Sequence, residues 1–385
     1  MTGRHERSRV YRVAISGSYG GMNLGDEAIL QCILQQLRAS VQVEVTVFSE
    51  HPEDTLRRHH VERAVDARRW SREEVLAEVE GLDLFILGGG GILFDEWLDD
   101  HLREGSLARD KGVPMAVYAV GDGPVLDPAH RQAVRECFTR AELVTVRDHR
   151  TRQALERLGV RRDIIVTADP AVLLEPDPLP KDALKREGLD GSRRLFGVSV
   201  REPGSAAPDI DTNQYHALLA DAADYIVERF DAMVVFVPME PEQQDLQHAH
   251  AVVSKMRAPQ SATVLRGRYS AGQMLALMDH FDFVVGMRLH FLAFAALDRV
   301  PFVALPYASK VTGFLEELEL ETPPLQHLGA GQLLAYIDRS WDRKATIKQL
   351  VDRNLPSMQA RARETNELVV GLLGAKRPSP MPLAR

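Results

Sequence analysis

The sequence has little cysteine and no long apolar run, and both shortages exclude classes of protein. Its 385 residues include only Cys32 and Cys137. Neither belongs to a Cys-x-x-Cys pair or a Cys/His spacing that suits a metal, so we expect no zinc site and no disulfide framework. No apolar stretch approaches the roughly 20 residues of a transmembrane helix. Residues 1–9 are polar and the apolar stretch 10–15 is too short for a signal peptide. We therefore expect a cytoplasmic protein without stable membrane insertion.

The sequence also has fewer basic residues than acidic ones. Lysine and arginine number 47 against 55 aspartates and glutamates, which gives a formal net charge of −8. Nonspecific nucleic-acid binding requires a basic surface that neutralises phosphates, so nucleic acid is not an expected partner. A cleft can still carry a local positive potential. The composition, 45% hydrophobic and 26% charged, is typical of a globular protein, and the length favours two domains.

Short apolar segments rich in valine, isoleucine and phenylalanine alternate with longer amphipathic ones. The expected strands are 11–16, 43–48, 82–87, 113–119, 142–146, 163–167, 195–200, 232–237, 261–265, 281–285 and 300–305. The expected helices are 25–38, 71–80, 97–111, 128–140, 148–158, 213–229, 241–257, 270–279, 288–297, 311–318 and 330–339. This alternation predicts an α/β fold of two Rossmann-like domains, with parallel sheets, that face each other across a cleft.

Composition also indicates the domain boundaries. Three prolines and several charges between Glu175 and Gly191 are typical of a linker. We expect an N-terminal domain over 10–175, a linker over 176–191, a C-terminal domain over 192–340, and a helical segment over 341–373 that packs back across the domains. Residues 1–9 and 374–385 are expected to be disordered.

The first expected strand runs into a glycine-rich turn and a helix start, GSYGGMNLGDEAIL. Gly20 and Gly21 let the backbone approach a ligand closely, and the free N–H groups of the helix start favour an anion. Asn23, Asp26 and Glu27 add polar side chains there. The spacing is not Gly-x-Gly-x-x-Gly, so the dinucleotide fingerprint is absent. Two interpretations stay open, because Asp26 and Glu27 either face a ligand or only cap the helix.

Two further glycine loops are expected at the same edge of the first sheet. Gly89 and Gly90 belong to a run of four glycines after the strand 82–87, and this run is either a surface for close approach or a tight turn. Gly121–Pro124, which includes Asp122, follows the next strand. Ligands of such sheets bind beyond the carboxyl ends of the strands, so three glycine loops on one edge indicate a binding site.

Cations and a histidine follow other strands. Arg147 and Arg201 each come just after an apolar strand, where an arginine either reaches solvent or lines a cleft. Arg288 and His290 lie where an apolar strand meets a helix, and Lys310 lies near the start of the following helix. A lone histidine there is usually part of the core, but the neighbouring arginine favours a functional role. Lys310 opposes the dipole of its helix, which an anionic ligand would explain.

These motifs, in this order, resemble those of the polysaccharide pyruvyl transferase family over nearly the whole chain. The matching segments are Asn23–Leu30 (NLGDEAIL), Gly88–Gly91 (GGGG), Gly121–Pro124 (GDGP), Val146–Asp148 (VRD) and Gly286–Lys310, which begins GMRLH. The sequence departs from the family pattern in two segments. Ala308 and Ser309 stand where an acidic residue and a proline commonly precede the lysine, and Asp122 stands where an apolar residue is usual.

The resemblance implies a GT-B-like fold and transfer of pyruvate from phosphoenolpyruvate to two hydroxyls of a sugar, which forms a ketal and releases phosphate. It implies a catalytic role for His290. The residues implied to bind phosphoenolpyruvate are Arg147, Lys310, Arg288 and Arg201. The residues implied to lie on the acceptor side are Gly20, Gly21, Asn23, Asp26, Glu27, Gly89, Gly90 and Asp122.

The chemistry suits these residue types. Phosphoenolpyruvate carries a carboxylate and a phosphate on three carbons, so its binding requires convergent cations. An imidazole can both give and take protons near neutral pH. No metal or other cofactor is demanded, because fixed cations can neutralise the leaving phosphate.

Two alternative functions stay open. A nucleotide-sugar glycosyltransferase of the same architecture would need a ribose-binding carboxylate late in the second domain, where Glu316 and Glu317 are the close candidates. A non-catalytic sugar-binding protein would be favoured by loss of the His–Arg–Lys set, which is intact. The sequence leaves open the acceptor sugar, the ketal stereochemistry and the oligomeric state. A lipid-linked acceptor of cell-envelope synthesis would bring the protein to the inner face of the membrane.

Overall fold

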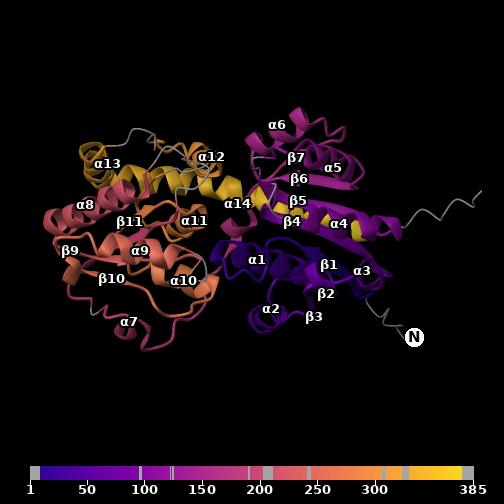
Figure 1. The fold of residues 1–385 in the computed structure, drawn as a ribbon, viewed down its shortest axis with the longest axis horizontal. Coiled ribbons are helices and arrows are strands. Elements are labelled where there is room, and N and C mark those ends of the chain that lie inside the picture. Colours follow the sequence, from indigo (N-terminus) through magenta and orange to yellow (C-terminus); the bar gives the residue numbers. More distant parts are fainter. Residues whose placement is uncertain are drawn as a thin grey trace, which may run out of the picture. The chain divides into compact units, whose positions relative to one another are not determined.

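A computed structural model describes residues 9–94, 98–121, 123, 125–189, 191–202, 211–240, 244–305, 309–322 and 329–374. Their secondary structure forms two parallel sheets, one of seven strands and one of five (Figure 1). The chain divides into two compact units. Unit 1 contains the described residues up to Ser18, those from Ile33 to Ala168 and those from Arg361 onward. Unit 2 contains Tyr19–Cys32 and Asp169–Ala360.

Unit 1 is built on the seven-stranded sheet, whose order is β3-β2-β1-β4-β5-β6-β7. Its strands are β1 (Tyr11–Ser16), β2 (Val43–Phe48), β3 (Arg63–Val65), β4 (Leu84–Gly91), β5 (Met115–Gly121), β6 (Leu143–Val146) and β7 (Ile165–Val166). Its helices are α2 (Pro52–His59), the 3-10 turn η1 (Ala67–Arg69), α3 (Arg72–Val79), α4 (Leu98–Asp110), α5 (Pro128–Thr139) and α6 (His149–Leu158). The order reverses between β1 and β4, as in doubly wound folds.

Apolar strand residues hold unit 1 together. Phe85 on β4 and Val117 on β5 are fully buried and pack with helix residues such as Phe138 on α5. The strands are apolar on both faces because helices cover both sides of a parallel sheet. The predicted strands and helices of this half are all present. The pattern missed α2 and β3. The strand β3 is hard to predict because it has three residues, of which only Val65 is buried.

The glycine run is part of a strand, which corrects the expectation of a loop. β4 continues to Gly91, and Gly88, Gly90 and Gly91 pair with β5. Gly88, Gly89 and Gly90 have φ values of 101°, 87° and 82°, which residues other than glycine rarely adopt. The four glycines therefore let the strand continue in an unusual backbone conformation.

Unit 2 is built on the five-stranded sheet, whose order is β10-β9-β8-β11-β12. Its strands are β8 (Arg194–Ser199), β9 (Ala232–Phe236), β10 (Ala262–Val264), β11 (Phe283–Gly286) and β12 (Phe302–Ala304). Its helical elements are η2 (Pro170–Leu173), α7 (Ala183–Arg186), α8 (Thr212–Phe230), α9 (Asp245–Val253), η4 (Pro259–Ser261), α10 (Ala271–Met278), α11 (Leu289–Leu297), α12 (Ser309–Glu317) and α13 (Ala330–Asp342). In its core Phe196 stacks on Phe230 and Trp341. The strands and helices predicted for this half are present.

The segment expected to be a linker packs onto unit 2. Glu187 accepts hydrogen bonds from the backbone N–H of Arg266 (3.0 Å) and Gly267 (2.8 Å) and from the hydroxyl of Tyr269 (2.8 Å). Its proline and charge content therefore marks an irregular part of a folded unit. The N-terminal turn also differs from the expected boundaries, since Tyr19–Cys32 clusters with unit 2.

Two helices contribute residues to both units. They are α1 (Leu24–Ser40) and α14 (Lys344–Gly374). On α14, Gln359 Nε2 donates to the carbonyl of Val172 within unit 2, and Thr365 Oγ1 donates to Thr167 Oγ1 within unit 1. Of the two ends expected to be disordered, only Arg9 and Gly374 are among the described residues. Within the described part of the chain, no helix is both long and apolar enough to cross a membrane.

Candidate functional site

His290 lies in the first turn of α11, just after β11. Arg288 is the N-cap residue of this helix and has an extended backbone. Most of α11 is buried, as its apolar sequence predicts. A Cβ at Gly286 would lie 2.5 Å from Leu292 Cδ2, which shows how closely the end of the strand approaches the helix. This close turn fixes where the imidazole of His290 emerges from the core.

The imidazole of His290 packs directly on Gly25, in the first turn of α1. A Cβ added to Gly25 would lie 1.8 Å from Nδ1 and 2.4 Å from Cγ of His290. Real Cβ atoms essentially never come within 3.0 Å of another heavy atom in this way. Position 25 must therefore be glycine if the ring is to lie where it does.

Asp169 lies at the other ring nitrogen. Its Oδ2 is 3.4 Å from Nε2 of His290, while its Oδ1 accepts a hydrogen bond from the backbone N–H of Ala171. The second contact caps η2 and holds the carboxyl group in place. A fixed carboxylate beside an imidazole limits the orientations that the ring can take.

Asp26 is the next residue on α1 and shares the electrostatic environment of His290. Burial raises the pKa of the Asp26 carboxyl to about 6, although the charges of His290 and Lys310 act in the opposite direction. The nearby carboxylates of Glu240 and Glu27 raise it further. A carboxyl group that titrates near neutral pH is able to exchange protons under the conditions of catalysis.

The other polar residues of the N-terminal turn stabilise the turn itself. Glu27 is buried and its Oε1 accepts a hydrogen bond of 2.9 Å from the backbone N–H of Gly20. Asn23 Oδ1 accepts from the N–H of Gly25. The backbone N–H of Leu24 donates to the carbonyl of Met239. These bonds fix the start of α1 and, through it, the surface on which His290 rests.

Arg288 forms ion pairs with two carboxylates of unit 2. Its Nε lies 3.0 Å from Oδ2 of Asp245 and its Nη2 also pairs with Asp245, while Nη2 lies 2.7 Å from Oε2 of Glu240. Asp245 is fully buried and also accepts from the N–H of Met239 and of Glu240. Arg288 therefore ties the loop after β9 to the N-terminus of α11. Arg201, two residues after β8, donates from Nε to the carbonyl of Glu202.

Arg147 lies in unit 1 and does not reach solvent, since its side chain is 4% exposed. Its backbone N–H donates to the carbonyl of Val120, and its Nε is 3.6 Å from Oδ2 of Asp148. A Cβ at Gly121 would lie 2.2 Å from Cζ of Arg147. The glycine that ends β5 thus provides the space for a buried arginine, and close approach of a ligand is not required to explain it.

The sheet of unit 1 is irregular beside this arginine. Ala119 on β5 has a φ of 44°, and its N–H donates to Oγ1 of Thr145 on β6 (2.8 Å). The register between the two strands shifts at this point. Strained backbone of this kind concentrates at functional sites. Gly89 and Gly90 lie on the adjacent β4, and Asp122 lies outside the described residues.

The predicted residues fall into two groups. Unit 2 holds His290, Lys310, Arg288, Arg201, Gly20, Gly21, Asn23, Asp26 and Glu27, and unit 1 holds Arg147, Gly89 and Gly90. The sequence pattern missed Asp169, Asp245 and Glu240. Asp169 lies three residues after the last strand of the first sheet and precedes a proline, a signal weaker than the position of Arg147 immediately after its strand. Nothing in the pattern distinguishes Asp245 or Glu240 from solvent-exposed carboxylates.

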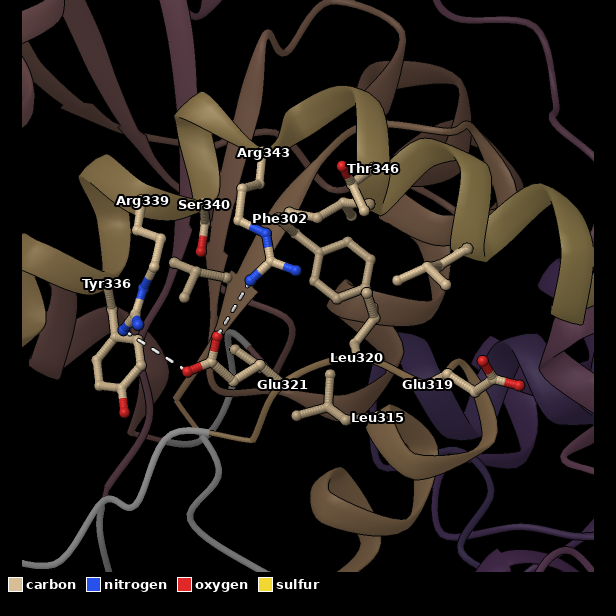
Figure 2. A pocket seen from close by; sticks show the side chains of 14 residues that line it. Phe302, Leu315, Glu319, Leu320, Glu321, Tyr336, Arg339, Ser340, Arg343 and Thr346 are labelled. Carbon is tan, nitrogen blue, oxygen red and sulfur yellow. Dashed lines mark ion pairs between the residues drawn. The ribbon is translucent and has the colours of Figure 1, made fainter.

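A separate cavity in unit 2 contains none of the predicted residues (Figure 2). It has a volume of about 60 Å³ and lies among β12, α12, α13 and the start of α14. Arg339 and Arg343 both point to Glu321, at 3.6 Å. Because these cations already face a carboxylate, we assign the cavity no catalytic role. Among the described residues, no group of three or more His, Cys, Asp or Glu side chains is placed to hold a metal ion.

Comparison with known proteins places this geometry in context. The sequence model of the polysaccharide pyruvyl transferase family matches residues 23–309. No curated protein sequence matches the chain significantly. Solved structures are similar at low sequence identity, and they show that the fold is GT-B-like.

Three such structures illustrate the similarity. A putative UDP-N-acetylglucosamine 2-epimerase from Listeria monocytogenes is 13% identical, with a TM-score of 0.66 over 96% of this chain and 99% of that one. S. aureus MnaA, in a co-structure with UDP, is 11% identical, with a TM-score of 0.66 over 96% and 100%. A glycosyltransferase from Rickettsia africae is 8% identical, with a TM-score of 0.63 over 96% and 100%.

Proposed function

This chain belongs to the polysaccharide pyruvyl transferase family, and from that membership we propose that it transfers pyruvate from phosphoenolpyruvate to two hydroxyls of a sugar. The products are a cyclic ketal and inorganic phosphate. The observation that carries the proposal is the setting of His290, which rests on Gly25, faces Asp169 and shares its environment with Asp26 and Lys310.

The cations of the chain would bind the donor. Lys310 is partly exposed in the first turn of α12 and acts electrostatically on Asp26, so its charge is near the histidine. Arg201 and the buried Arg147 are the arginines that we assign to the carboxylate and phosphate of phosphoenolpyruvate. Arg288 has a different part in this proposal. Because it pairs with Asp245 and Glu240, it positions the start of α11 and does not serve as a principal ligand of the donor.

The proposed steps balance as follows. Protonation of C3 turns the methylene of phosphoenolpyruvate into a methyl group and makes C2 electrophilic. One acceptor hydroxyl attacks C2 and loses its proton. The C2–O bond to phosphate then breaks, and the second hydroxyl attacks C2 while its proton leaves with the phosphate. The reaction needs a group that gives a proton to C3 and a group that accepts one from a hydroxyl.

His290 and Asp26 suit these two proton transfers. Asp169 would orient the imidazole, and the Asp26 carboxyl, with a pKa of about 6, can act as the partner of His290 near neutral pH. The steps require no metal, because fixed cations can neutralise the phosphate as it leaves. We place the enzyme in the cytoplasm, and at the inner face of the membrane when its acceptor is lipid-linked.

Calorimetric titration of phosphoenolpyruvate into the wild-type protein, His290→Ala and Lys310→Ala tests the proposal. We expect the wild type and His290→Ala to bind with similar affinity, and Lys310→Ala to lose most of the affinity. Release of phosphate with a neutral sugar should stop in His290→Ala. If UDP-sugars bind and phosphoenolpyruvate does not, the chain is a nucleotide-sugar enzyme and the proposal is wrong.

A further inference from the structure

A second polar cluster lies in unit 1, at the point where the strand order reverses. Ser16 is the last residue of β1, and His101 and Glu104 lie on α4, the helix that follows β4. Ligands of doubly wound folds bind at this switch point, beyond the carboxyl ends of the strands. None of the steps proposed above uses these three side chains.

The three side chains form one buried network. Ser16 Oγ donates to Oε2 of Glu104 over 2.5 Å and lies 3.5 Å from Nδ1 of His101. All three residues are at most 3% exposed. Because Ser16 gives its only proton to Glu104, its oxygen is left to accept from the Nδ1–H of His101. In that tautomer, Nε2 of His101 carries a lone pair and acts as an acceptor.

Nε2 of His101 has no hydrogen-bond partner within the described part of the chain, although it is buried. A buried polar atom without a partner costs about 1–3 kcal/mol, so folded proteins seldom retain one without a reason. Burial lowers the pKa of His101 to about 4, which means that protonation does not relieve this cost at neutral pH. A hydroxyl group that donated to Nε2 would relieve it.

The space beside the cluster fits one such group. A cavity of about 10 Å³ is lined by the three side chains and by residues where β1 and β2 end. The other lining residues are Gly17, Phe48, Ser49, Glu50, Arg68 and Asp100. This volume is about the minimum that holds one water-sized oxygen.

The charges around the cavity favour a neutral ligand. Burial raises the pKa of Glu104 to about 8, so this carboxyl is mostly protonated at pH 7. At the rim, Arg68 lies 3.4 Å from the carboxylate of Glu50, and Asp100 adds another carboxylate. An anionic group would therefore face two carboxylates and one arginine that is already paired.

We propose that this pocket binds one hydroxyl group of an uncharged sugar, with the hydroxyl donating its proton to Nε2 of His101. The identification of that sugar as the acceptor rests on the function proposed above, whereas the hydroxyl-binding chemistry does not. The pocket accordingly selects neutral hexosides over sugars that carry a carboxylate.

Saturation-transfer NMR on the full chain tests this selection without phosphoenolpyruvate. The probes are methyl β-D-galactopyranoside, methyl β-D-glucopyranoside and methyl β-D-glucuronide. We expect at least one neutral glycoside to bind and the glucuronide to bind at least about 10-fold more weakly. His101→Phe keeps an aromatic ring but removes Nε2, so it should weaken neutral binding about 10-fold. Gly331→Ala, on α13 of unit 2, adds a Cβ that meets no atom within 4 Å and should keep the wild-type affinity.

Three results would overturn the inference. They are unchanged glycoside affinity in a folded His101→Phe protein, tighter binding of the glucuronide, and no neutral binding at all. If His101→Phe fails to fold by circular dichroism, Ser16→Ala takes its place, because it removes the hydroxyl that orients the histidine. Phosphoenolpyruvate binding without glycoside binding would refute the pocket and leave the transferase proposal standing. The reverse result would refute the transferase and leave the pocket.

Discussion

Replacement of Gly25 by alanine is the sharpest perturbation that the structure offers. The new Cβ would lie 1.8 Å from Nδ1 of His290, and ordinary contact begins at 3.4 Å, so the ring must move by about 1.6 Å. Displacement of a catalytic group by about 1 Å costs on the order of 10²-fold in rate. We therefore expect Gly25→Ala to lower kcat by at least about 10²-fold while leaving donor affinity close to that of the wild type.

A matched control separates this effect from any general effect of alanine in a helix. Gly331 is the second residue of α13, as Gly25 is of α1, and a Cβ at Gly331 meets no atom within 4 Å. Gly331→Ala should keep full activity. It should also gain up to about 1 kcal/mol of stability, because alanine favours helices more than glycine does. The assay is phosphate release from phosphoenolpyruvate, with unfolding followed by circular dichroism.

The reasoning would be refuted by a Gly25→Ala protein that keeps the wild-type kcat. Such a result would mean that the imidazole position seen here does not serve the reaction. Equal loss in Gly25→Ala and Gly331→Ala would refute it too, since the loss would then reflect the helices and not the histidine. If Gly25→Ala loses activity only because the protein unfolds, the melting curve will show this.

Three further predictions follow from buried groups. Because burial raises the folded pKa of Asp26 from 3.8 to about 6, stability should fall as pH rises through this window. Asp26→Asn should then raise the free energy of unfolding by about 2 kcal/mol at pH 7, allowing for the partial exposure of the side chain. Urea melts that show no gain would contradict this. Gly121→Ala should displace the buried arginine beside it and raise the KM for phosphoenolpyruvate, whereas Gly91→Ala, with no atom within 4 Å of its Cβ, should leave the KM unchanged. Arg288→Met should lower the free energy of unfolding by about 3–5 kcal/mol, because the carboxylate of Asp245 loses its ion pair. Adding Asp245→Asn should restore part of this stability. If urea melts of the double variant show no recovery, the lost ion pair is not the cause.

The strands and most helices follow from hydrophobic patterning, because a strand covered on both faces must be apolar throughout. Val117 and Phe85 are examples of positions that the pattern predicts and the structure buries. The pattern is weaker where elements are short or polar. It missed β3, and it interpreted the segment around Glu187 as a linker although that residue accepts three hydrogen bonds from unit 2.

The candidate site was predictable only in part. The sequence made His290 and Lys310 candidates because each lies near the start of a helix that follows an apolar strand, and their functional roles stay predictions. Asp169 and Asp245 could not be assigned, since a carboxylate beside a helix start is common and its partner lies far away in the sequence. Pairing between distant residues depends on the tertiary fold, which local patterns do not contain.

The roles of the glycines show most clearly what a local interpretation lacks. Glycines are usually explained by a positive φ, as at Gly89 and Gly90, but neither Gly25 nor Gly121 has one. An alanine could adopt the backbone conformation at both positions, yet its Cβ would overlap a ring nitrogen of His290 at one and the guanidinium of Arg147 at the other. These glycines are required by the side chains that lie against them. Substitution at either position should therefore spare the local backbone and displace the side chain that we assign to the reaction.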